Sequence, residues 1–340
     1  MVVEQQQFAD LVFEGGGVKG IGLAGAFAAL QEHGFAHKRV AGTSAGAITA
    51  ALVAAGYSAA ELDEILLDVP FARFKDQAWE DKLPVIDRTA SVLLDLGIYE
   101  GRYFQGWMGE LLERKGITRF GQLADDDAED FKSRYRLKVI ASDVTHRRML
   151  VLPDDAGHLG IEPDELDIAY AVRMSMSIPV FFEPVVHANP RTGDEHLIVD
   201  GGMLSNFPVW LFDCEGRDPA WPTFGLMLVE PDPKVAIGHR LAGEEHGVSR
   251  GSLIDYFKAL ASTMMAAHDR LYIEKATFAR TIPIPTLGIG TTEFDITPER
   301  VHTLYESGHG AAAEFLDRWD FAAYIDEYRR GQQHSRRADT

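Results

Sequence analysis

The sequence predicts an α/β domain with a mostly parallel central sheet between layers of helices. Residues 8–56 alternate between apolar strand-like segments and helix-like segments, a pattern typical of parallel strands joined by helices. Apolar runs that suit buried strands recur at residues 137–141 and 224–229. The sequence has no internal repeat and no low-complexity linker. We therefore expect one domain with added helices rather than several domains.

The first βα unit contains a glycine-rich turn. The apolar strand Asp10–Glu14 runs directly into Gly15–Gly20. The helix predicted next, Lys19–His33, spaces its apolar side chains for burial on a sheet, and Gly34 is expected to end it. Such a turn presents a row of backbone N–H groups at a helix start, where negative charge is favoured.

The second βα unit presents a serine. A short strand, Arg39–Ala41, leads into the Gly-x-Ser-x-Gly motif Gly42–Gly46 and then into the small-residue helix Ala45–Ala55. This context is the one that exposes a serine on a sharp turn. Ser44 would stand at a helix N-terminus, whose dipole favours a developing alkoxide. A nucleophile beside an anion-binding loop is what acyl transfer to a serine requires.

The remaining elements follow from hydrophobic patterning and turn residues. We predict further strands at Tyr135–Ser142, Arg147–Leu152, His196–Val199, Phe224–Val229 and Thr281–Ile289. We predict helices at Tyr103–Lys115, Asp167–Ser175 and Leu253–Phe278, one or two closing helices within Pro298–Arg330, and a capping box at Ser58–Glu61. Phe71–Asp95 is favoured as an ordinary connection over a cap on the active site, and Val235–Ser252 is expected to be a mobile loop.

Charge and cysteine content exclude several classes of protein. The chain has 340 residues, with 33 Lys and Arg against 52 Asp and Glu, so its formal net charge is −19. Such acidity argues against nucleic acid and against charge-driven docking on anionic lipid. Cys214 is the one cysteine, which excludes an intrachain disulfide and a cysteine-based metal cluster. No spacing of ligand residues suggests a metal or a cofactor.

The N-terminus carries no signal-peptide pattern, because Met1–Gln7 lacks a basic region and an apolar core. The longest run of small apolar residues, Ala45–Gly56, is too short to span a bilayer. We therefore expect a cytoplasmic protein, and specialised secretion remains compatible with the sequence.

The glycine-rich turn also matches a nucleotide-binding pattern. Gly15-x-Gly17-x-x-Gly20 fits the dinucleotide fingerprint, which requires an acidic residue at the end of the next strand. That strand ends in Ala41-Gly42-Thr43-Ser44 and supplies no acid. A Walker-type loop fails as well, since no Gly-Lys-Ser/Thr follows.

Ser44 needs a proton acceptor, and Asp200 is the best candidate. It follows the apolar strand Leu197–Val199 and precedes Gly201-Gly202, at the strand end where α/β proteins place ligand sites. Asp200 could accept the Ser44 proton directly, or it could simply begin a turn. A Ser–Asp–His arrangement is also open, completed by one of the histidines that follow Asp200: His239, His246, His268, His302 and His309.

These motifs resemble the patatin-like phospholipases, bacterial members included. The resemblance covers about residues 8–295 and rests on three motifs in this order and spacing: Gly15–Gly20, Gly42–Gly46 and Asp200–Gly202. Weaker similarities lie at Met174–Pro179, Asn206–Pro208 and in the closing stretch from Arg280–Ile282 to Gly290–Phe294. Many members have Arg where this chain has Lys19, which keeps the charge but not the bidentate fork.

The resemblance implies a patatin-type three-layer α/β/α fold and a serine acyl hydrolase of the phospholipase A or lysophospholipase kind. It implies a Ser–Asp dyad without histidine, with Ser44 as nucleophile and Asp200 as base. The oxyanion hole would come from backbone amides at Gly15, Gly16, Gly17 and Lys19, with Gly20, Gly42, Gly46, Gly201 and Gly202 supporting the motifs. The acyl hydrolase domain would span 8–295, with C-terminal helices at 296–330 and a disordered tail at 331–340.

The expected partner is a lipid or fatty-acyl ester substrate, met by transient contact with a membrane or micelle surface. No metal and no cofactor are expected. Two alternatives stay open besides the dyad enzyme: a Ser–Asp–His esterase, and a non-catalytic ligand-binding module that uses the glycine-rich loop.

Overall fold

The computed structural model describes residues 6–68, 97–99, 101–128, 131–214, 218–230, 275–291, 293 and 295–329. Three predicted features lie outside the described residues: the segment Phe71–Asp95, the loop Val235–Ser252 and the tail Gly331–Thr340. Most of the predicted helix Leu253–Phe278 also lies outside them, and its end falls in the short helix α8 (Lys275–Ala279). Among the helices that are described, none combines the length and apolar character needed to cross a membrane.

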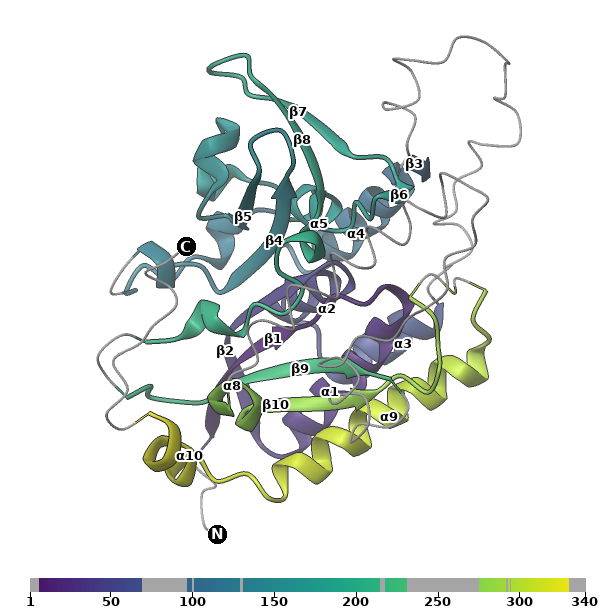
Figure 1. Ribbon diagram of the computed structural model, residues 1–340, viewed down its shortest axis with the longest axis vertical. Helices are drawn as coiled ribbons and strands as arrows, with labels where there is room; N and C mark the ends of the chain where they lie inside the picture. Colours follow the sequence, from purple (N-terminus) through teal and green to yellow (C-terminus); the bar gives the residue numbers. More distant parts are fainter. Residues whose placement is uncertain are drawn as a thin grey trace.

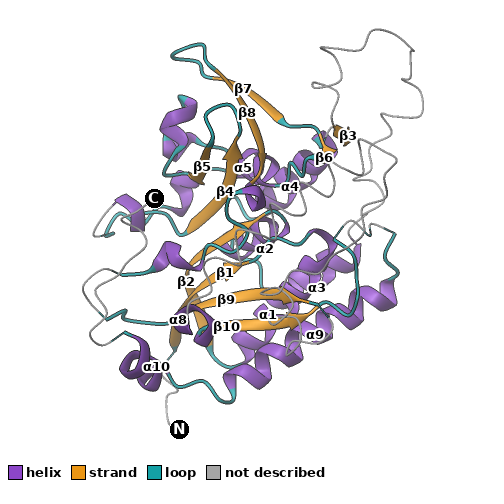
Figure 2. Ribbon diagram, in the orientation of Figure 1, coloured by secondary structure: helices purple, strands orange, loops and turns teal. Residues whose placement is uncertain are grey.

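A mixed sheet forms the centre of the molecule (Figure 1, Figure 2). Hydrogen-bonded pairing connects its strands in the sequence β10-β9-β1-β2-β4-β8-β7, and β5 also pairs with β4. The pairs from β10 to β4 are parallel, whereas β5 and β8 run antiparallel to β4, and β7 runs antiparallel to β8. The strands are β1 (Gln7–Phe13), β2 (Phe35–Thr43), β4 (Leu137–Asp143), β5 (Arg148–Leu152), β7 (Val185–Ala188), β8 (Glu195–Asp200), β9 (Thr223–Val229) and β10 (Thr281–Pro285). A separate parallel pair joins β3 (Gly97–Tyr99) to β6 (Val180–Phe182).

Helices and a larger hydrophobic core cover one face of this sheet. The helices that contribute buried side chains to this core are α1 (Ile21–Glu32), α2 (Ala45–Ala54), α3 (Ala59–Asp68), α4 (Arg102–Arg114), α5 (Ile168–Ser175) and α9 (Pro298–Leu316). A further helix, α10 (Phe321–Tyr328), follows α9. Figure 1 shows α9 running beside α1, and α2 lies on β1, β2 and β4. On the opposite face, the apolar side chains of Val209–Phe212 contact Val12, Ala41 and Ile140. The α/β class and the mostly parallel sheet predicted from the sequence are therefore confirmed.

Three elements near the N-terminus have boundaries that differ from the predictions. β1 spans Gln7–Phe13 instead of Asp10–Glu14. β2 begins at Phe35 rather than at Arg39. Its first half is polar and partly exposed, so no apolar run indicates a strand there, but it pairs with β1. The helix expected over Lys19–His33 begins as a turn of 3₁₀ helix at Gly17–Gly20 before α1 starts. The glycine-rich turn is therefore tighter than an α-helical start would be.

Near the C-terminus, the strand expected over Thr281–Ile289 ends as β10 at Pro285. Leu287 and Gly288 have positive φ angles of 55° and 73°, which a strand cannot accommodate. The closing segment forms two helices, α9 and α10.

The capping box predicted at Ser58–Glu61 is confirmed by reciprocal hydrogen bonds. The Glu61 carboxylate accepts the Ser58 N–H at 2.8 Å, and the Ser58 hydroxyl accepts the Glu61 N–H at 3.3 Å. Together these bonds satisfy N–H groups that the first turn of α3 leaves without helical partners.

Candidate active site

Ser44 follows β2, and Asp200 is the last residue of β8. The ends of these two strands meet along one edge of β4. β2 runs parallel to β4, and its last residue, Thr43, pairs with Ile140. β8 runs antiparallel to β4, and its last residue, Asp200, pairs with Ala141. Since β5 occupies the other edge of β4 at these positions, β2 and β8 share one edge and end at consecutive residues of it. The strand pairing therefore brings Ser44, the residue after β2, next to Asp200.

The turn that carries Ser44 is strained. Ser44 has φ 54° and ψ −126°, a conformation that costs a non-glycine residue on the order of 1–3 kcal/mol. Its N–H donates to Ser175 Oγ at 2.8 Å. Gly42 and Gly46 meet so closely that a Cβ on Gly42 would lie 2.2 Å from the Gly46 carbonyl oxygen. Glycine at these two motif positions lets the chain reverse sharply at the end of β2.

Asp200 is a fully buried carboxyl group with one oxygen engaged. Its Oδ1 accepts the Gly202 N–H at 2.7 Å, whereas Oδ2 has no hydrogen-bond partner of normal geometry among the described residues. Burial raises the pKa of Asp200 to about 7, and the Ser44 hydroxyl and the Gly202 N–H oppose this rise. Asp200 can therefore gain or lose a proton near neutral pH.

The Ser44 hydroxyl lies within reach of this carboxyl group without closing a normal hydrogen bond to it. It is near enough to lower the pKa of Asp200, yet its Oγ is directed to Met176 Sδ at 3.7 Å. The Ser44 hydroxyl and the Asp200 carboxyl group therefore form a loose pair in this conformation. Both side chains are fully buried, and substrate entry must expose them.

The glycine-rich loop lies beside the Ser44 turn. A Cβ placed on Gly15 would be 3.1 Å from Ser44 Cβ, and one on Gly20 would be 2.9 Å from Ala45 Cβ. Gly201, after Asp200, lies against the Ile140 carbonyl, 2.2 Å from where its Cβ would stand. The three glycine motifs that the sequence analysis selected are thus brought together in one region.

The four predicted oxyanion donors differ in their availability. The Gly15 N–H donates to the Asn206 carbonyl at 3.1 Å, and the Lys19 N–H donates to the Gly16 carbonyl at 3.2 Å. The amides of Gly16 and Gly17 have no acceptor within the described residues, and Gly17 adopts a positive φ of 57°. These two N–H groups can receive an external anion without breaking an existing bond.

The Lys19 side chain is engaged away from the loop. Its Nζ lies 2.6 Å from Glu230 Oε1, just after β9. This ion pair joins the loop to the end of a neighbouring strand.

The end of α5 supports both Ser44 and Asp200, a role that the sequence analysis did not assign. Ser175 Oγ accepts the Ser44 N–H and donates to the Ile140 carbonyl at 2.6 Å. The Ser177 carbonyl accepts the Asp200 N–H at 2.9 Å, while the buried Arg173 donates to Ser177 Oγ at 2.5 Å. The signal in the sequence was Met174–Pro179, noted there as a similarity without a function.

Asn206 has a comparable supporting role for the glycine-rich loop. Its side-chain amide donates to the Gly15 carbonyl at 3.1 Å and to Glu14 Oε1 at 3.3 Å. The segment after Asp200-Gly201-Gly202 therefore holds the loop at the end of β1.

The histidines considered as bases do not join this site in the described part of the chain. No described histidine hydrogen-bonds to Ser44 or Asp200. His302 is exposed on α9, and His309 lies 2.8 Å from Glu32 of α1. His239, His246 and His268 lie outside the described residues.

The fold and sequence define the class of the protein. A mixed α/β sheet with a serine on a sharp strand–helix turn is present, and the family model described as patatin-like phospholipase matches residues 11–213. The chain therefore belongs to the patatin-like phospholipase family, as its motifs predicted.

The chain is also similar to individual proteins. The uncharacterized protein YqhO of Bacillus subtilis is 38% identical over 317 residues, which cover 92% of this chain and 100% of that protein. An uncharacterized NTE family protein of Mycobacterium tuberculosis is 27% identical over 266 residues, covering 74% of this chain and 38% of its own length. The crystal structure of VipD from Legionella pneumophila matches the fold with a TM-score of 0.57 and 18% identity, over 92% of this chain and 67% of that chain.

Proposed function

We propose that this protein is a lipid acyl hydrolase of the phospholipase A or lysophospholipase kind, acting through Ser44 and Asp200. Membership of the patatin-like phospholipase family supports lipid hydrolysis in general. The observation that carries the finer proposal is the meeting of a strained, buried serine with a buried carboxyl group whose pKa is about 7. No cofactor is needed for this chemistry.

In the acylation step, Asp200 accepts the Ser44 hydroxyl proton as Oγ attacks the ester carbonyl carbon. The negative charge passes to the carbonyl oxygen, where the N–H groups of Gly16 and Gly17 would stabilise it. The tetrahedral intermediate then collapses, the bond to the leaving alcohol breaks, and Asp200 returns the proton to that alcohol oxygen. Ser44 is left as an acyl ester.

In the deacylation step, Asp200 accepts a proton from water, whose oxygen attacks the acyl carbonyl. Collapse of the second intermediate releases the fatty acid and restores the Ser44 hydroxyl with the proton from Asp200. General-base assistance contributes about 10²–10⁴-fold in rate, and one oxyanion donor contributes about 10²–10³-fold.

Covalent labelling tests which residue is the nucleophile. A fluorophosphonate loses fluoride and forms a phosphonyl ester with an activated serine. We expect the label on the Ser44 peptide of the wild-type protein, found by mass spectrometry, and no label on folded Ser44→Ala. Ester turnover together with labelling of a different serine would refute the proposal.

Histidine variants separate the dyad from a triad. We expect alanine at each of the five candidate positions to keep wild-type ester turnover: His239, His246, His268, His302 and His309. Of these, His302 and His309 lie in the described part of the chain and make no hydrogen bond to Ser44 or Asp200. Loss of turnover in any of these folded variants would favour a Ser–Asp–His esterase. Absence of any ester turnover, combined with calorimetric binding of a dinucleotide, would favour a ligand-binding module instead.

A further inference from the structure

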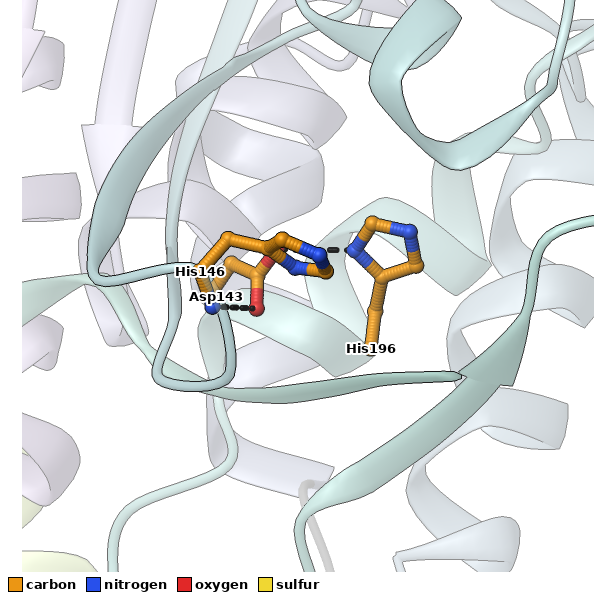
Figure 3. Close-up of side chains that lie close together, drawn as sticks. All are labelled: Asp143, His146 and His196. Atoms are coloured by element: carbon orange, nitrogen blue, oxygen red, sulfur yellow. Dashed lines mark hydrogen bonds and ion pairs between the residues drawn. The ribbon is translucent and has the colours of Figure 1, made fainter. Parts of the chain in front are cut away.

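Three side chains of metal-binding type meet away from Ser44. Asp143 is the last residue of β4, His146 lies in the turn to β5, and His196 is in β8. Each offers one ligand atom, and these atoms all lie within 4.8 Å of one another. Figure 3 shows both imidazole rings gathered around the Asp143 carboxylate. We refer to these three residues as the Asp143 cluster.

The two imidazoles converge on one oxygen atom. Asp143 Oδ2 lies 2.8 Å from His196 Nδ1 and 2.9 Å from His146 Nδ1. The ring centroids of the two histidines are 4.4 Å apart. Asp143 is fully buried and His196 is 5% exposed, whereas the His146 side chain is 33% exposed. The cluster is therefore preorganised on its inner side and open to solvent through His146.

A cation could balance the negative charge of the Asp143 carboxylate. In the described part of the chain, Asp143 pairs with the two histidines and with no lysine or arginine. The His146 N–H donates to Asp143 Oδ1 at 3.1 Å and the two imidazoles reach Oδ2. When both imidazoles are neutral, these hydrogen bonds satisfy the carboxylate oxygens but do not balance their negative charge. One carboxylate oxygen and two imidazole nitrogens are a ligand set that Zn²⁺ and related divalent ions favour.

The free nitrogen of His196 allows the ring to become a ligand. His196 Nε2 is buried and has no hydrogen-bond partner in the described structure. A proton can therefore move from Nδ1 to Nε2, and the contact of Nδ1 with Asp143 Oδ2 is the one hydrogen bond that this move gives up. The Nδ1 lone pair is then available to a cation. His187, the partner of His196 across the β7–β8 pair, differs because Tyr170 Oη and the Leu159 carbonyl oxygen occupy its two nitrogens at 3.1 and 2.8 Å.

We propose that Asp143, His146 and His196 form a binding site for a divalent transition-metal ion of the Zn²⁺ type, with water completing the coordination. The ion would accept the carboxylate oxygen and the two imidazole lone pairs, and any proton displaced from a charged imidazole would pass to solvent. It would join the end of β4, the turn to β5 and the beginning of β8. This site is independent of the proposed ester hydrolysis.

Metal titration of the full chain tests the proposal. After treatment with a chelator and its removal, Zn²⁺ is titrated by calorimetry, and Co²⁺ is titrated while its visible absorption is followed. We expect a saturable site and Co²⁺ absorption typical of nitrogen and oxygen ligands. Replacing a group at such a site weakens metal affinity by at least about tenfold, so His146→Ala should show this loss. His302→Ala, at an exposed position outside the Asp143 cluster, should bind as the wild type does.

A second variant guards against misfolding. His196→Asn removes a buried ligand, and its circular dichroism spectrum is compared with that of the wild type before titration. We expect folded His196→Asn to lose the Co²⁺ absorption and the rise in melting temperature that Zn²⁺ gives the wild type. The proposal is overturned if the wild type shows no saturable binding, or if His146→Ala binds Zn²⁺ as tightly as His302→Ala does.

Discussion

The hydroxyl of Ser175 accepts the backbone N–H of Ser44 at 2.8 Å. The same hydroxyl donates to the Ile140 carbonyl at 2.6 Å, so one side chain joins the strained turn to β4. Ile140 is also the residue that pairs with Thr43 at the end of β2. The end of α5 therefore fixes the position of Ser44 against β4. Asp200, at the end of β8, pairs with the same strand.

Ser175→Ala removes this connection and leaves both the Ser44 amide and the Ile140 carbonyl without their partner. We expect stability to fall by about 1–3 kcal/mol, the cost of unsatisfied buried groups, and kcat to fall by at least about tenfold because a small displacement of the nucleophile is costly. Urea unfolding and ester kinetics measure the two effects.

Ser307→Ala is the matched control, since Ser307 Oγ donates to the Pro285 carbonyl at 2.8 Å and has no contact with the Ser44 turn. It should lose stability and keep kcat. Unchanged kcat in Ser175→Ala would show that Ser175 does not position the nucleophile.

The pH dependence of kcat/KM should follow Asp200, whose pKa burial raises to about 7. The ionised carboxylate is the form that accepts the serine proton, so activity should rise with pH and level off above 7. At pH 5 the rate should be about 1% of the plateau. His309→Ala should keep this profile, and a flat profile from pH 5 to 8 would contradict the assignment of Asp200 as base.

Asp200→Asn should be more stable than the wild type at pH 8. The folded-state pKa of about 7 lies above the ordinary aspartate pKa of 3.8, so the stability contributed by protonated Asp200 is present below pH 3.8 and lost as pH rises through 7. Asparagine does not ionise and can still accept the Gly202 N–H. The gain in the free energy of unfolding of Asp200→Asn over the wild type should grow from pH 5 to pH 8 and reach at most on the order of 4 kcal/mol. Urea unfolding at each pH measures it. A wild type that is the more stable protein at pH 8 would refute this reasoning.

Lipid-surface contact should depend little on anionic lipid. The net charge of −19 offers no general electrostatic attraction, which for basic segments is worth about 1 kcal/mol per lysine or arginine. Activity on neutral phosphatidylcholine vesicles should stay within about threefold when anionic lipid is added at constant substrate. A steep rise in activity with the fraction of anionic lipid, abolished by high salt, would instead reveal a basic docking surface.

Sequence reasoning succeeded where the determining contacts are local. The strand, glycine turn and helix units around Gly15–Gly20 and Gly42–Gly46 are continuous in the chain, so their patterns predict their structures. The head-to-head approach of β2 and β8 depends instead on pairing with β4, which no local pattern encodes. The same non-local pairing brings His196 to Asp143 and His146, and so the sequence did not indicate that cluster.

The energetic properties of the site also required the structure. The pKa of Asp200 depends on complete burial, and burial follows from the layers around the strand end rather than from the Asp-Gly-Gly motif. Similarly, the free amides of Gly16 and Gly17 are distinguished from that of Gly15 by the contact with Asn206, a residue distant in sequence.

Hydrolysis of a chain-length series of p-nitrophenyl esters by wild type, Ser44→Ala and Asp200→Asn tests the Ser–Asp pair most directly. We expect turnover by the wild type and a loss of at least about 10²-fold in each variant, with both variants folded by circular dichroism. The variation of rate with acyl length would also report the depth of the acyl pocket. Turnover near the wild-type level in either folded variant would contradict the account.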